Sequence, residues 1–181
     1  MASGRPVLRV VVGGLVLGHG LQKLNGSFDG PGLEGTEQAM GAIGLHPAHY
    51  QARAAALSET VGGALTAAGL FSPLGPAMIM GTMLVAIKKV HAKNGVWVSK
   101  GGAEYNVTLI AAAFAMAAEG PGPLSLDGFV FRRNRSGLRW ALVSLALAAG
   151  AAAVTLSVAE RMAPPADPAD DESSAGPSDP G

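Results

Sequence analysis

The residues best suited to chemistry near the start of the chain are His19, Gln22 and Lys23, which close an apolar run. From Pro6 to Leu24 only Arg9 and Lys23 are charged, and about 19 residues of helix cross roughly 28 Å of hydrocarbon. The spacing i, i+3, i+4 places the three polar side chains on one helical face. In a membrane helix such residues usually face a bundle interior or a water-filled cavity, where they bind ligands or move protons. In the plainer alternative, Lys23 reaches the membrane surface and His19 only packs.

Other polar residues interrupt the later apolar segments at corresponding positions. Glu59 lies inside Ala52–Phe71, Lys88 and His91 close the segment that begins at Ala77, and Glu104 opens the segment that ends at Glu119. If four spans alternate in direction, all these residues fall at one membrane face. We therefore predict a one-sided polar pocket lined by His19, Gln22, Lys23, Glu59, Lys88, His91 and Glu104.

Glu59 is the deepest carboxylate of this set, and a buried charge is tolerated mainly when it is paired. We predict that it contacts Lys23 or Lys88. At the opposite face, Glu119 and Asp127 are expected to have no basic or histidine partner before Arg132.

The composition favours a membrane protein. Of 181 residues, 49% are hydrophobic and 14% are charged, against roughly 25% charged in soluble domains. The formal net charge is +0, so no overall basic field points to nucleic acid. The chain has no cysteine, which excludes disulfides, thiolate nucleophiles and cysteine-ligated metal or iron–sulfur sites. A redox role would need a bound cofactor or a partner.

The elements that must position the pocket are apolar helices. We predict spans over Pro6–Leu24, Ala52–Phe71, Ala77 to about Val90, Glu104–Glu119 and Leu138–Val158. Gly14 and Gly18 form a G-x-x-x-G pair that could pack closely against a neighbour. The polar connection Asn25–Gln51 is expected to be a loop with a short helix from Thr36. His46 and His49 within it are interpreted as a turn rather than a metal site.

The chain resembles the DoxX family. The residues that carry the resemblance span roughly Val7 to Gly128, and their order is far more specific than any single piece. They are Gly18–Lys23, Gly44-Leu45 before Glu59–Gly63, Val85–Ile87 with His91, Gly102–Tyr105, and Gly120–Asp127.

The resemblance implies an all-α fold, a membrane four-helix bundle, to which this chain adds a fifth C-terminal transmembrane helix. The expected domains are the DoxX-like bundle at 1–128, a basic linker and fifth helix at 129–161, and a disordered acidic, Pro-rich tail at 162–181. Better-known relatives are linked to quinone-coupled oxidation of sulfur compounds and to membrane-associated oxidoreductase complexes. The resemblance therefore implies a multi-pass protein of the plasma membrane.

Three functions remain open on the sequence. The first is an accessory membrane subunit or partner of a quinone-linked or other oxidoreductase complex, without an assigned catalytic residue. The second is a small transporter with a proton or solute pathway, and the third is a membrane scaffold. A haem held by His19 and His91 is the less favoured cofactor, and no metal site is predicted. The expected partners are the lipid bilayer, a redox enzyme and a second copy of the chain, and the arginines from Arg132 to Arg139 favour an N-terminus inside the cell.

Overall fold

The computed structural model describes residues 4–132 and 135–164, and within these ranges the chain forms helices and no β-strand. The predicted all-α class is therefore confirmed. The predicted tail lies almost entirely in 165–181, outside the described residues. The α-helices are α1 (Gly4–Asn25), α2 (Gly32–Ala42), α3 (Ala48–Ala68), α4 (Leu74–Ala86), α5 (Glu104–Glu119), α6 (Leu126–Val130) and α7 (Leu138–Arg161), and α4 continues into one π-helical turn at Ile87–His91.

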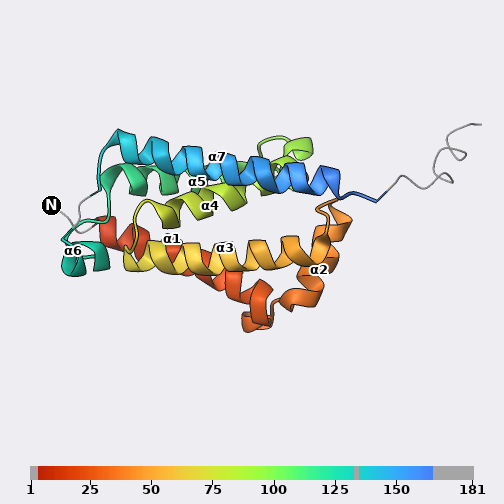
Figure 1. Cartoon of the computed structure of the whole chain (residues 1–181), viewed down its shortest axis with the longest axis horizontal. Helices are drawn as coiled ribbons and strands as arrows, with labels where there is room; N and C mark the ends of the chain where they lie inside the picture. Colours follow the sequence, from red (N-terminus) through yellow and green to blue (C-terminus); the bar gives the residue numbers. More distant parts are fainter. Residues whose placement is uncertain (1–3, 133–134, 165–181) are drawn as a thin grey trace, which may run out of the picture.

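The long helices lie side by side in two groups (Figure 1). α1 packs on α3, while α4, α5 and α7 pack on one another, and α3 joins the groups through α4. Short α2 lies where α1 ends and α3 begins, which we call the α2 end of the molecule. Short α6 lies at the opposite end, beside the start of α1, which we call the α6 end.

Local chemistry moves three helix starts away from the predicted positions. α3 begins at Ala48, four residues before the predicted Ala52, directly after Pro47. α4 begins at Leu74 directly after Pro73, three residues earlier than predicted. In both cases the proline sits just outside the helix, where its missing N–H costs nothing. α2 begins at Gly32 rather than Thr36, whose hydroxyl donates back to the Gly32 carbonyl at 2.7 Å.

Glycines bring the backbones of α1 and α3 into contact, but they are not the predicted pair. Gly14 and Gly18 have open space around them. A Cβ added to Gly13 would come within 2.7 Å of the Gly63 carbonyl oxygen, and one added to Gly20 within 2.7 Å of the Thr60 Cα. Only residues without a side chain permit such an approach. The correct close-packing face is therefore Gly13 and Gly20 against the Thr60–Gly63 turn of α3.

The apolar core lies between α1, α4 and α5, with one contribution from α7. Ile79 and Met80 of α4 are fully buried at its centre. α7 adds Ala148, and the buried Ser144 hydroxyl donates to the Pro73 carbonyl at 3.1 Å. Of the described helices, α1 and α7 are both long and apolar enough to cross a bilayer, with mean hydropathies of 1.3 and 2.1. The buried residues of the apolar core are Val12, Val16, Ile79, Met80, Met83, Leu109, Ala113, Met116 and Ala148.

Candidate functional site

A partly open cavity of about 810 Å³ lies between the helices. It receives side chains from α1, α2, α3, α4, α5 and α7, and most of them are apolar. Ligand pockets in proteins are commonly about 300–1,000 Å³ and combine apolar walls with a few placed polar groups. The cavity is therefore large enough for a small organic ligand.

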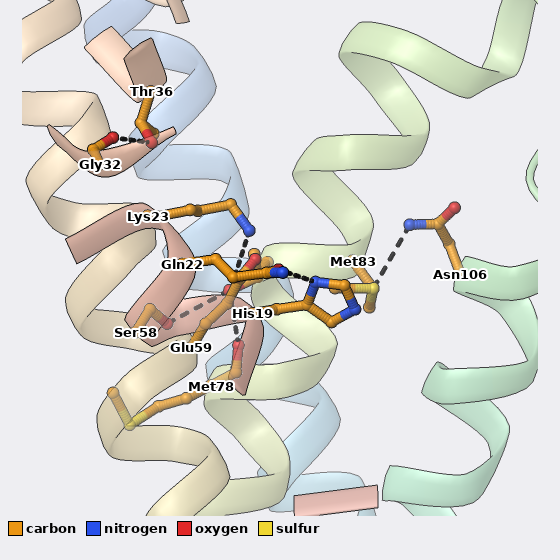
Figure 2. A network of polar contacts seen from close by, with 11 residues as sticks. His19, Gln22, Lys23, Gly32, Thr36, Ser58, Glu59, Met78, Met83 and Asn106 are labelled. Atoms are coloured by element: carbon orange, nitrogen blue, oxygen red, sulfur yellow. Dashed lines mark hydrogen bonds and ion pairs between the residues drawn. The ribbon is translucent and has the colours of Figure 1, made fainter. Parts of the chain in front are cut away.

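An ion pair between Lys23 and Glu59 forms part of the wall (Figure 2). The Glu59 side chain is only 6% exposed, while that of Lys23 is 25% exposed. The two residues meet because Gly20 lets α1 touch α3 at Thr60, next to Glu59. Of the two lysines that the sequence offered as partners, Lys23 makes the contact. A carboxylate this deep in the protein is stable only with such compensation.

His19 also lines the cavity and is held by its neighbour on the same helix. Its Nδ1 lies 3.0 Å from Oε1 of Gln22 (Figure 2). Because a carbonyl oxygen can only accept, Nδ1 is the donor in this contact, and Nε2 is left for another partner. Gln22 does not line the cavity. Its amide orients the imidazole, whose Nε2 can accept or release a proton.

His91 reaches the cavity from the π-helical turn that ends α4. Its Nδ1 lies 2.7 Å from the carbonyl oxygen of Gly101, so it donates to that oxygen and again leaves Nε2 uncommitted. A π-helical turn holds one more residue than an α-helical turn and is frequent at functional sites. Lys88, in the same turn, is exposed and lies outside the cavity lining.

Three residues of the predicted pocket do not line the cavity. Gln22 and Lys88 have been described above, and Glu104 supports the loop before α5. Glu104 does not line the cavity; its Oε2 accepts from the Val98 backbone N–H at 3.0 Å. The structure brings His19, Lys23, Glu59 and His91 to the cavity and leaves Gln22, Lys88 and Glu104 outside the lining.

Asn106 is a cavity residue that the sequence analysis missed. It is 5% exposed, and among the described residues its amide nitrogen donates to the Met83 sulfur alone, at 3.3 Å (Figure 2). A thioether is a weak acceptor, so this amide is a poorly satisfied buried group. Tyr105 lines the cavity next to it. The sequence signal that could have identified both residues is their position directly after Glu104, where two polar residues begin an otherwise apolar helix.

Buried polar residues also lie at the α6 end, outside the predicted pocket. Arg9 is 5% exposed, and its guanidinium donates to the carbonyls of Pro121 and Leu124, the latter at 2.6 Å. Asp127 is 4% exposed and accepts from the backbone N–H groups of Phe71 at 3.0 Å and Ser72 at 2.8 Å.

The expectation that Glu119 has no basic partner before Arg132 was wrong. Arg5 Nε pairs with Glu119 Oε2 at 3.2 Å. The prediction considered only later residues, whereas the start of α1 lies at the same end of the molecule. Among the described residues, no three histidine, aspartate or glutamate side chains are grouped so that they could hold a metal ion.

Comparisons with known proteins agree with this architecture. Residues 4–92 match the DoxX family model. A protein of Bacillus subtilis (strain 168) named "Putative oxidoreductase CatD" is 33% identical over 134 residues, which cover 74% of this chain and 92% of that relative. No solved structure matches the chain. With a family match through α1, α3 and α4 and a relative similar over nearly its whole length, the chain belongs to the DoxX family of membrane proteins.

Proposed function

We propose that the protein is an accessory membrane subunit of a quinone-linked oxidoreductase complex and that its cavity binds the quinone ring. The observation that carries the proposal is the cavity itself, because its apolar walls surround Lys23, Glu59, His19 and His91. The name of the Bacillus subtilis relative gives independent support for an oxidoreductase system.

The proposal includes a multi-pass topology in the plasma membrane, with α1, α3, α4 and α5 as a four-helix core and α7 as a fifth span. Support comes from α1 and α7, which are apolar enough to span a bilayer. The outer surfaces of the other helices also carry exposed apolar side chains, among them Leu57 and Val61 of α3 and Val107 of α5. Lipid is the surrounding that such surfaces need.

The residues present fit a quinone ring. The two ring carbonyls are acceptors, so a binding site must supply donors in an apolar surrounding. The Lys23 ammonium, the Tyr105 hydroxyl and the poorly satisfied Asn106 amide are donors at the cavity wall. The Nε2 atoms of His19 and His91 make no hydrogen bond to the residues that the structure describes, and they donate when the ring is protonated.

A bound quinone accepts two electrons and two protons, and the electrons would come from the partner enzyme. The chain's own residues would hold the ring and provide protons at its oxygens. Lys23 and the histidines are the groups in the cavity that would supply these protons, and each would take a replacement proton from water through the open side of the cavity, while the Glu59 carboxylate holds the Lys23 ammonium in place. This assignment needs no catalytic side chain that forms a covalent bond.

One observation favours a different function. Lys23 and Glu59 already satisfy each other, as they would in a scaffold whose polar pair only fixes helix register. In that case, replacing both residues with apolar side chains of similar length should leave the protein intact in every respect. A transporter lacks a comparable observation in the structure.

The discriminating experiment compares wild type with the double variant Lys23→Met/Glu59→Met. Quinone co-extracted with the purified protein is measured by mass spectrometry, and folding is measured by thermal unfolding in the same detergent. We expect wild type to retain quinone. The folded double variant should bind quinone at least about tenfold more weakly, which corresponds to ~1.4 kcal/mol in binding free energy. Arg53→Met, an exposed change on α3, is the control. Equal quinone in all three proteins, or none in wild type, would contradict the proposal.

A further inference from the structure

The cavity extends beyond the polar residues into a groove between α3, α4 and α7. On α4 its lining residues Leu74, Met78 and Thr82 are four residues apart, so they form one stripe along the helix. On α7, Leu147, Ala151 and Thr155 form a matching stripe at the same spacing. The α3 wall of this groove is Gln51, Ala54, Ala55 and Ser58.

The groove is long, narrow and mostly apolar. From Leu147 to Thr155 the α7 stripe covers about 12 Å along the helix axis at 1.5 Å per residue. Alanines line both of these walls, Ala54 on α3 and Ala151 on α7, and leave room that larger side chains would fill. Such a shape suits a flexible hydrocarbon chain better than a second ring.

Closure at one end gives the groove a direction. At the α2 end, the buried Gln51 amide lies 3.5 Å from the Thr155 carbonyl and 3.4 Å from the His46 carbonyl, which joins α3 to α7. At the other end, Leu74 and Leu147 are 44% and 51% exposed. The lining residues Ala54 and Ala151 are exposed as well, so a chain that starts near Glu59 can reach the surrounding lipid between α3 and α7 or past these leucines.

We infer that this groove binds the isoprenoid or alkyl chain of the ligand whose ring lies at the Lys23–Glu59 end, and that α7 determines which chain is accepted. The inference rests on the proposed function, because it places the second half of the same ligand. Its independent support is that ring site and groove are parts of one cavity, whose volume of about 810 Å³ exceeds what one small ring requires. α7 lies outside residues 4–92, so the wall that α7 gives to the groove is an addition to the part of the chain that matches the family model.

The test measures chain dependence of binding. Decylubiquinone and the same dimethoxy-methyl-benzoquinone ring without a chain are titrated into full-length protein in one detergent, and binding is read from the rise in melting temperature. Each buried methylene contributes about fourfold in affinity, so wild type should bind the decyl compound at least about tenfold more tightly than the bare ring.

Ala151→Phe fills the groove from α7 and should reduce this affinity ratio to about one, while binding of the bare ring is unchanged. Ala153→Phe is the matched control, because Ala153 is exposed on α7 but does not line the cavity. Ala54→Phe fills the groove from α3 and replaces Ala151→Phe if that variant fails to fold. Comparing this ratio between wild type and each variant in the same detergent cancels the partition of the two ligands into micelles.

The two hypotheses fail in different ways. If the bare ring binds wild type but the affinity ratio survives both phenylalanine variants, the groove inference is overturned and the quinone function stands. If decanoate, an alkyl chain without a ring, competes with the decyl compound but the bare ring never binds, the groove holds ordinary lipid and both are overturned.

Discussion

At the scale of single residues, the two members of the Lys23–Glu59 pair are not equivalent. The Glu59 side chain is 6% exposed and sits within α3, whereas that of Lys23 is 25% exposed near the end of α1. A long lysine side chain can move its ammonium group toward water when its partner is lost. A carboxylate at the position of Glu59 has no such freedom.

We therefore predict unequal costs for the two single changes. Lys23→Met leaves a buried charge without a partner and should cost about 3–5 kcal/mol in the free energy of unfolding. Glu59→Gln leaves only the more exposed ammonium and should cost clearly less. Reversible unfolding in mixed micelles measures both, with the double variant Lys23→Met/Glu59→Met expected to be more stable than Lys23→Met alone. Equal destabilisation by the two single changes would show that burial does not distinguish them.

The Lys23–Glu59 contact could be predicted from the sequence, whereas the contacts of Arg9 could not. An acidic residue deep in an apolar segment demands a cation, and alternating spans bring Lys23 to its level. Arg9 gave no comparable signal, because its partners are backbone carbonyls of a loop more than a hundred residues away. Any residue has a carbonyl, so this contact could be found only in the folded chain.

At the scale of elements, the segment Gly120–Asp127 fastens the α6 end of the bundle. Arg9 of α1 holds its first half through two carbonyls, and Asp127 ties its second half to the turn before α4. The Asp127 backbone N–H also donates to the Gly69 carbonyl at 3.0 Å. One loop thereby joins α1, the α3–α4 turn and α6.

We predict that Asp127→Ala destabilises the protein without affecting quinone binding at the other end. Two backbone N–H groups would lose a charged acceptor, and hydrogen bonds to charged groups contribute about 1.5–3 kcal/mol each. Thermal unfolding should show the loss, with Gln38→Ala, an exposed change within α2, as a near-neutral control. Unchanged stability would mean that water replaces the carboxylate at this turn.

Helix bounds could be predicted from the sequence where the helix begins or ends together with an apolar run. α5 has both predicted bounds, and α7 begins at the predicted Leu138 and ends three residues later than expected, at Arg161. α3 and α4 began earlier because the first turn after a proline is polar or short of apolar residues, so hydrophobic patterning does not mark it. The π-helical turn has no pattern that separates it from an α-helix, and it decides that His91 rather than Lys88 lines the cavity.

At the scale of the whole molecule, the basic residues at the α6 end indicate its orientation. Arg135 and Arg139 lie over the Trp140 ring, with guanidinium carbons 5.2 and 5.5 Å from its centre. Arg132, in the connection that leads to α7, is exposed. An arginine cluster with an aromatic ring is typical of the cytoplasmic surface of a membrane protein.

We predict that the α6 end faces the cytoplasm. Because the chain has no cysteine, single cysteines can be added without first removing others. Ser99→Cys, at the exposed loop before α5, should react with a membrane-impermeant maleimide in intact cells. Ser136→Cys, before α7, should react only after the membrane is opened. The reverse pattern would show the opposite topology.

The glycine contacts between α1 and α3 have a consequence for motion. Gly13 and Gly20 leave no gap into which either helix could shift, so the two helices should move as one rigid body. Lys23 and Glu59 both belong to that body, one on each helix. α7, by contrast, meets the groove with Leu147, Ala151 and Thr155, and among the described residues a long hydrogen bond of 3.5 Å from Gln51 joins it to α3 there. Opening of the cavity to admit a ligand should therefore be a displacement of α7 away from an unmoving ion pair.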